Sequence, residues 1–163
     1  MSADSRTQLF FLEHVVENKK VWEQDPLMPH TAMNFAVSLN QLVDYFWEEF
    51  RSDPARVLGA TTCSAFRSAL RSSHPEFALI HDVADAHKHY KLTRQTRRVT
   101  EASQATLGAL RWDDAVWDDA RWDSPAEIVV TLDDGSKRSF ATAAVATYEM
   151  WREKLLSAGL GAA

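Results

Sequence analysis

The segment from Thr31 to Phe50 constrains the fold of this chain most, because its apolar side chains recur at helical spacing throughout. Positions i, i+4 and i+7 share one face of a helix, which is the face that packs against the core. A broad stripe of this kind predicts a central helix that packs against several neighbours. The stripe comprises Ala32, Phe35, Ala36, Leu39, Leu42, Val43, Phe46, Trp47 and Phe50.

Three more segments in the first half of the chain have helical patterns, and typical helix ends separate them. Asp4 or Ser5 can cap the first of these, which ends before two prolines. The next runs from Thr61 to Ser72. The last begins at Pro75, because proline suits the first turn of a helix. Residues 1–92 therefore predict a four-helix bundle.

After the bundle the pattern changes from helical spacing to that of strands. Arg97 to Ala102 has a strand pattern. Glu127 to Leu132 and Ser136 to Phe140 flank Asp133-Asp134-Gly135, and an Asp-Gly pair between such runs is typical of a tight hairpin. We therefore predict a small antiparallel sheet over residues 97–140.

A C-terminal helix is predicted over residues 141–158, beginning at Thr142 and stopping before Gly159. The predicted fold class is α+β, mainly α: a four-helix bundle, then a small antiparallel β-sheet and a C-terminal helix. At this length we expect a single domain, residues 1–163. The last helix should pack back on the bundle through Val145, Tyr148, Trp151 and Leu155.

The composition of the chain limits the cellular compartment and the types of chemistry that we expect for it. The single cysteine, Cys63, excludes an internal disulfide and fits a reducing compartment, and we expect it to be a small buried residue rather than a nucleophile. With no signal peptide and no apolar run of membrane-spanning length, we expect a cytoplasmic protein without membrane contact. No phosphate-binding glycine pattern is present, so no cofactor is expected.

Residues 80–94 concentrate the unusual side chains, with three of the six histidines of the chain. On a helical wheel His87 lies in the middle of the apolar arc, so we expect it to be buried and hydrogen-bonded by a neighbouring helix. Asp82, Asp85 and His89 lie on the opposite face, toward solvent or a partner. The alternative is a functional groove in which His87, His89, Asp82 and Asp85 are the catalytic candidates.

The same helix offers two possible metal-ligand pairs, because side chains four residues apart can share one ion. The pairs are His81 with Asp85, and Asp85 with His89. His81 and His89 lie about 12 Å apart along a straight helix, which is too far for one ion. We therefore expect a solvated polar face and no metal site.

Charge is distributed unevenly along a chain whose net charge is −5. Residues 88–98 hold five basic side chains and no acidic one, whereas residues 111–123 hold five aspartates and two arginines. A basic cluster can bind phosphates, which makes RNA a possible partner. The candidates for phosphate contacts are Lys88, Lys91, Arg94, Arg97 and Arg98.

The acidic stretch is also a short repeat, in which Trp112, Trp117 and Trp122 recur every five residues. This period matches neither a helix nor a strand, so the tryptophans would not line one face of either. We interpret residues 111–123 as an expanded loop between strands. Its tryptophans would fold back onto the domain or contact a protein partner.

The string from Ile80 to His89, followed by Leu92-Thr93-Arg94, resembles a motif of uncharacterised bacterial and phage proteins. These proteins continue with an Asp-Asp-Gly hairpin and a C-terminal helix carrying an aromatic–Trp pair. The resemblance covers about residues 31–156 and implies a fold but no activity. More distantly, a polar residue followed by a histidine late in a helical bundle resembles HEPN domains.

Many HEPN domains are metal-independent ribonucleases or RNA binders that act as dimers. The active site of these domains has an arginine, a polar residue and a histidine on one helix. At the corresponding positions this chain has His81, Asp82 and His87, so the arginine is missing.

Two functions follow as hypotheses. The first is a non-enzymatic interaction module that forms a homodimer and binds a protein partner through the tryptophan repeat. The second is a HEPN-like protein that binds or cuts RNA, with His87 or His89 as the acid or base. Because no complete catalytic set is visible, the sequence favours the first.

Overall fold

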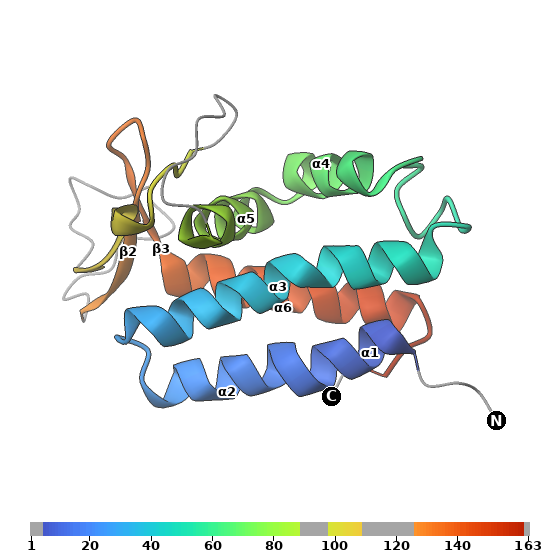
Figure 1. Cartoon of the computed structure of the whole chain (residues 1–163), viewed down its shortest axis with the longest axis horizontal. Helices are drawn as coiled ribbons and strands as arrows, with labels where there is room; N and C mark the ends of the chain where they lie inside the picture. Colours follow the sequence, from blue (N-terminus) through green and yellow to red (C-terminus); the bar gives the residue numbers. More distant parts are fainter. Residues whose placement is uncertain (1–4, 89–97, 109–125, 162–163) are drawn as a thin grey trace.

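The computed structural model describes residues 5–88, 98–108 and 126–161 (Figure 1). The first helical run continues without a break through three segments, an α-helix, a π-helix and a second α-helix. The helical elements are α1 (Arg6–Phe10), the π-helical η1 (Phe11–Val16), α2 (Glu17–Gln24), α3 (Pro29–Phe50), α4 (Cys63–Ser73), α5 (Pro75–Lys88), the short 3-10 helix η2 (Ala102–Gln104) and α6 (Phe140–Ser157). The strands are β1 (Ala105–Gly108), β2 (Glu127–Thr131) and β3 (Lys137–Ser139).

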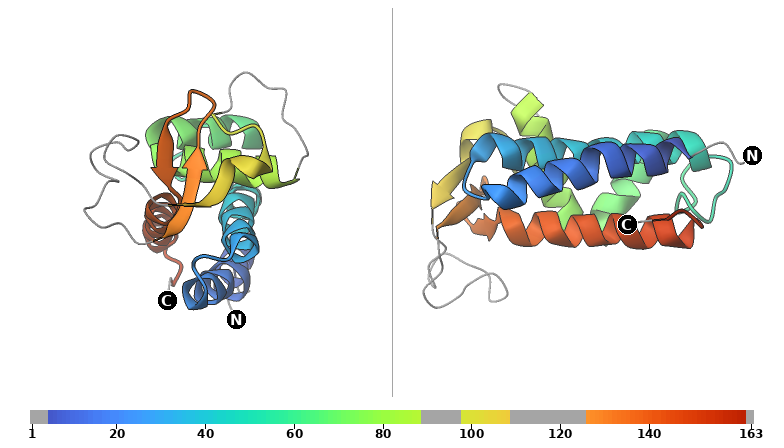
Figure 2. Two further views of the ribbon diagram at one scale, coloured as in Figure 1. Left: turned by 90° about the vertical axis from the view of Figure 1, so that its left-hand side faces the viewer. Right: turned by 90° about the horizontal axis from the view of Figure 1, so that it is seen from below.

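The long helices lie side by side along the molecule, and the small sheet covers one end of them (Figure 1). The shorter helices α4 and α5 pack on the opposite side of the bundle from α2, as the end-on view in Figure 2 shows. This architecture confirms the predicted α+β, mainly α, fold class. Within the described ranges, no helix has both the length and the apolar character needed to cross a membrane.

Helix α3 is the central element that its sequence predicts. Every residue of the predicted stripe is at most 8% exposed. The Phe46 ring lies within 6 Å of the rings of Phe50, Phe66 and Trp151, which come from three different helices. One of the two predicted caps of the first helix also forms: Ser5 Oγ accepts from the Gln8 N–H at the start of α1.

The predicted hairpin is confirmed, with Gly135 at a φ of 84° in the turn between β2 and β3. The strand predicted at Arg97–Ala102 is wrong over residues 98–102, the part that the structure describes, because β1 begins only at Ala105. The Gln104 side-chain oxygen accepts from the main-chain N–H groups of Thr100 and Glu101, both at 2.7 Å. These donors are thereby satisfied without a neighbouring strand.

Helix α6 returns along the bundle, and Trp151 donates its indole N–H to the Leu39 carbonyl oxygen at 3.1 Å. Tyr148, Trp151 and Leu155 are buried as predicted. The placement of Val145 is wrong, because it is 43% exposed. Its neighbour Ala144 faces the core instead, and one residue along a helix turns the side chain by about 100°.

Candidate functional site

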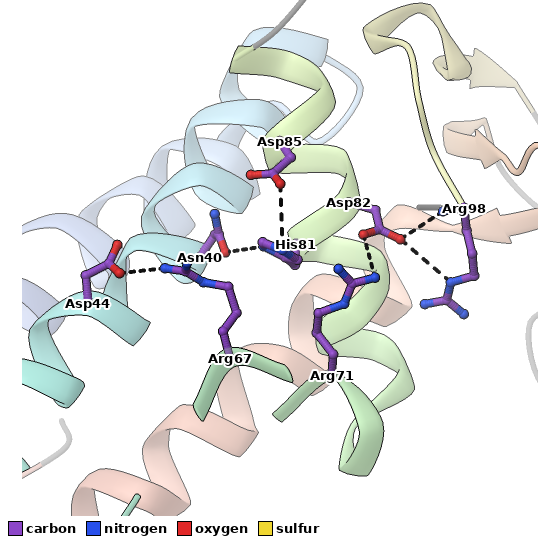
Figure 3. Close-up of polar contacts among 8 residues, drawn as sticks. All are labelled: Asn40, Asp44, Arg67, Arg71, His81, Asp82, Asp85 and Arg98. Atoms are coloured by element: carbon purple, nitrogen blue, oxygen red, sulfur yellow. Dashed lines mark hydrogen bonds and ion pairs between the residues drawn. The ribbon is translucent and has the colours of Figure 1, made fainter. Parts of the chain in front are cut away.

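Helix α5 is enclosed by neighbours along most of its length, and it carries polar side chains into that enclosure. It packs against α3, α4 and α6, so few of its faces are left to solvent. His81 is 3% exposed and Asp82 is fully buried. A buried charge or imidazole destabilises the fold unless it is hydrogen-bonded or paired. The partners of these two residues define the site (Figure 3).

His81 is held between helices α3 and α5. Its Nδ1 lies 2.7 Å from Oδ1 of Asn40, and because an amide oxygen only accepts, Nδ1 is the donor. Its Nε2 lies 3.7 Å from Oδ2 of Asp85, one turn further along α5. The ring also stacks on Phe77, with 6.1 Å between the centroids. Nε2, on the other side of the ring, faces the partly exposed Asp85 carboxylate.

Asp82 joins three segments of the chain. Its Oδ1 lies 3.0 Å from Nη2 of Arg71 on α4, and its Oδ2 accepts from the main-chain N–H of Arg98 at 3.1 Å. The Arg98 Nε lies 3.8 Å from the same oxygen, and its Nη2 donates to the Pro75 carbonyl at 3.0 Å. Burial raises the pKa of Asp82 to about 6, although the Arg98 N–H and the two guanidiniums act in the opposite direction.

A second polar cluster lies between α3 and α4, beside the first (Figure 3). Asp44 Oδ1 accepts from Arg67 Nη2 at 2.5 Å and from the Cys63 thiol at 3.3 Å. Burial, together with the hydrogen bond to Asp44 and its charge, raises the pKa of Cys63 to about 11. Cys63 is therefore a thiol at neutral pH, and a thiol is a poor nucleophile.

The prediction for His87 is wrong: His87 is exposed and His81 is the buried histidine. On the helical wheel His87 lies on the apolar face, but neighbouring elements cover the end of α5 less than its middle. His87 and Lys88 are therefore both exposed. The solvent-facing prediction for Asp82 is also wrong. Its partners Arg71 and Arg98 lie on other segments, which a wheel of one helix does not include.

Several predicted site residues lie outside the described residues, so their positions stay predictions. Among the described candidates, Asp85 is half-buried beside His81, and Arg98 is paired with Asp82 although its side chain is 39% exposed. Within residues 5–88, 98–108 and 126–161, no group of three or more His, Cys, Asp or Glu side chains has the geometry to hold a metal ion. The candidates outside these ranges are His89, Lys91, Arg94, Arg97, Trp112, Trp117 and Trp122.

Sequence reasoning missed Asn40 and Arg71. Asn40 carried a usable signal, because it lies within the apolar stretch of α3 and is only 4% exposed. A buried amide needs a partner, and His81 supplies it. Arg71 carried no such signal, because its pairing with Asp82 depends on how α4 packs against α5.

The arrangement links four segments of the chain. Asn40 connects α3 to α5, while Asp82 connects α5 to α4 and to the chain entering the sheet.

The chain matches no protein-family model, and neither the curated proteins nor the solved structures contain a significant match to it.

Proposed function

We propose that this protein is a non-enzymatic helical interaction module that assembles with a second copy of itself. The first support is the state of His81 and Asp82, the two buried titratable side chains of α5. A general acid or base must reach the proton that it transfers, but His81 is 3% exposed and Asp82 is fully buried. Both side chains bind neighbouring segments of the same chain. Their role is therefore to hold the fold together.

The observation that carries the proposal is the place where the tryptophan repeat enters the fold. Gly108 pairs with Glu127 at the end of the β1–β2 ladder. The stretch of sequence that contains the repeat, residues 109–125, therefore connects two strands that are paired with each other. Binding segments are commonly loops that a rigid scaffold holds in place. Here the scaffold is a sheet that α6 and α3 support.

Further contacts fix this sheet to the bundle. Gln104 donates to the Thr131 carbonyl at 2.9 Å, and the Asp133 N–H donates to the Arg98 carbonyl at 2.8 Å. Arg98 is in turn bound to Asp82 on α5. The attachment points of the repeat are thus coupled to the helical core through hydrogen bonds at each step.

Charge favours a second copy as the partner. Residues 88–98 hold five basic side chains, of which Arg98 is already paired with Asp82, and residues 111–123 hold five aspartates. If the acidic stretch of one copy meets the basic stretch of the other, the contact is repeated by symmetry and gives a two-fold dimer. Tryptophans are enriched among residues that dominate binding energy at interfaces, and the repeat supplies three of them.

The test replaces residues 111–123 with a short Gly-Ser linker and measures the mass of both proteins by sedimentation velocity over a wide concentration range. We expect the wild type to reach twice the 18.4 kDa chain mass and the deletion to remain a monomer with an unchanged circular dichroism spectrum. A second variant keeps the tryptophans and changes the five aspartates to asparagine. It should dimerise more weakly and respond less to salt.

A wild-type protein that stays monomeric at every concentration would overturn the proposal. The RNA hypothesis is tested beside it by fluorescence anisotropy with a single-stranded oligonucleotide. A variant that combines Lys91→Ala, Arg94→Ala and Arg97→Ala keeps Arg98, which is bound to Asp82. If the wild type binds RNA with a clear salt dependence and this variant does not bind it, RNA binding is supported in place of self-association.

A further inference from the structure

Four consecutive apolar residues lie exposed where the chain passes from α2 into α3. They are Pro26, Leu27, Met28 and Pro29, and the last of them is the first residue of α3. Leu27 is 39% exposed and Met28 is 40% exposed. Single exposed apolar side chains are common on soluble proteins, whereas contiguous ones mark a contact surface. This turn is therefore a candidate interaction surface.

Hydrogen bonds and packing hold the turn in place. The Met28 carbonyl oxygen accepts from the buried Thr31 hydroxyl at 2.8 Å and from the Ala32 N–H at 3.3 Å. On the α2 side, the Trp22 ring is 5% exposed and stacks on Phe35, with 5.4 Å between the centroids. Binding to a preformed surface loses less conformational entropy than binding to a surface that must first become ordered. The apolar side chains of the turn are thus presented on a fixed backbone.

Strand β1 adds a third exposed apolar side chain, Leu107. Leu107 lies opposite Ile128 of β2, and residues opposite each other point to the same face of a sheet. Ile128 is 2% exposed and belongs to the hydrophobic core, so this is the face that packs on the helices. Leu107 is nevertheless 57% exposed. The core-facing side of the sheet therefore continues past the helices at β1 and leaves Leu107 uncovered.

Leu107 and the turn lie at the same end of the molecule. Strand β1 contacts α3, and Figures 1 and 2 show the sheet at the end where α2 stops and α3 starts. We call Leu27, Met28 and Leu107 the end patch. In the single chain each of them keeps more than a third of its surface exposed. We therefore assign their cover to a second molecule.

The tryptophan repeat is the segment of this chain whose composition and attachment fit the end patch. Residues 109–125 follow Gly108, the neighbour of Leu107, and return to β2, so both attachment points lie at the end of the β1–β2 ladder. Three of the six tryptophans of the chain are in this stretch. Tryptophan rings bury a large apolar area, and a flexible methionine thioether adapts to an aromatic ring.

We propose that the tryptophan repeat of one copy docks on the end patch of a second copy. This docking rests on the self-association proposed above and names the surface that receives the repeat. Because each copy carries both parts, the contact occurs twice about a two-fold axis. The tryptophan rings cover Leu27, Met28 and Leu107, while the aspartates between the rings pair with the basic stretch of the other copy.

The test compares three full-length proteins by sedimentation velocity over a wide concentration range: the wild type, an end-patch variant and a control. The end-patch variant, Leu27→Asp with Met28→Asp, places two negative charges where the aspartate-rich repeat would dock. It should dimerise at least about tenfold more weakly than the wild type. All substituted positions are exposed, so the circular dichroism spectra should be unchanged.

The matched control is Leu9→Asp with Leu58→Asp, which makes the same change of charge at side chains that are 39% and 46% exposed. These residues lie on α1 and on the connection between α3 and α4, away from the sheet (Figure 1). The control should dimerise like the wild type. If both double variants weaken dimerisation equally, the effect is one of net charge and the proposal is wrong.

A mixing experiment tests the pairing itself. The protein in which a Gly-Ser linker replaces residues 111–123 keeps the end patch but has no repeat, whereas the end-patch variant keeps the repeat but has no apolar patch. At a concentration where each is a monomer, the mixture should form a heterodimer, because only the mixture contains one intact contact. A mixture that contains only monomers would overturn the proposal.

The results also separate this docking from self-association as such. If the wild type dimerises, the linker variant does not, and the end-patch variant dimerises like the wild type, self-association is supported but the end patch does not receive the repeat. If the wild type stays monomeric at every concentration, both proposals are wrong.

Discussion

The fully buried carboxylate of Asp82 accepts a hydrogen bond from the main-chain N–H of Arg98, sixteen residues further along the chain, at 3.1 Å. Because the donor belongs to the main chain, this contact fixes the path of the backbone and not only a side chain. The Arg71 guanidinium completes the arrangement from α4 at 3.0 Å. The entry of the chain into the sheet is therefore anchored on the centre of the helical core.

Asp82 should make the stability of the protein depend on pH in the opposite direction from an exposed aspartate. Burial raises its pKa from 3.8 to about 6, so between these values the folded state binds more protons than the unfolded state. The stabilisation is complete below pH 3.8 and is lost as the pH rises through about 6. Relative to Asp82→Asn, the wild type should lose up to about 3 kcal/mol between these limits.

The measurement is urea unfolding of wild type and Asp82→Asn from about pH 3 to about pH 7, which extends beyond both ends of the window between 3.8 and about 6. Asp25→Asn, an exposed position at the end of α2, reports the effect of removing a carboxylate from the surface. A constant difference between wild type and Asp82→Asn at every pH would contradict the prediction.

His81 should contribute more to stability than His87. Replacing His81 with alanine leaves a cavity and an unsatisfied Asn40 oxygen, so we expect a loss of about 2–4 kcal/mol in the free energy of unfolding. His87→Ala removes an exposed side chain and should change stability by about 0.5 kcal/mol or less. Chemical denaturation of both variants decides the point, and equal losses would refute this assignment of the buried histidine.

The helices and the hairpin were predictable because their signals are local. The apolar spacing of α3 and the Asp-Gly pair before β3 each lie within one element, and both predictions are confirmed. The strand at Arg97–Ala102 was wrong because a side chain, Gln104, took the place of a neighbouring strand as hydrogen-bond acceptor. The alternation of apolar and polar residues along a segment does not show whether a side chain or a neighbouring strand accepts its main-chain hydrogen bonds.

The polar site was only partly predictable for a related reason. The sequence indicated the right helix, but the wheel assigned burial from angle alone, whereas coverage by neighbours also changes along the helix axis. Asp82 is buried because Arg71 and Arg98 reach it from outside α5, and His87 is exposed near the helix end. Which residue of a polar helix is buried therefore depends on contacts between distant segments.

Phe46 should be among the residues on which stability depends most. It is 1% exposed and its ring contacts aromatic rings of α3, α4 and α6. Phe46→Ala should lower the free energy of unfolding by about 3–5 kcal/mol, because the cavity adds to the lost burial. Val145→Ala, at an exposed position of α6, is the control and should have little effect. A Phe46→Ala protein that melts at the wild-type temperature would contradict the central position of α3.

Cys63 should react slowly with alkylating reagents until the solution is strongly alkaline. Burial and the Asp44 carboxylate raise its pKa to about 11, and only the thiolate is reactive. Asp44→Asn removes the negative charge and leaves Arg67 nearby, so the thiol pKa should fall and alkylation at mildly alkaline pH should accelerate. Because Cys63 is the single cysteine of the chain, iodoacetamide labelling followed by mass spectrometry reports on it alone.

The control is the unfolded wild type, where both burial and the Asp44 contact are lost and labelling should be fast. Identical pH profiles for folded wild type and Asp44→Asn would show that Asp44 does not control the thiol.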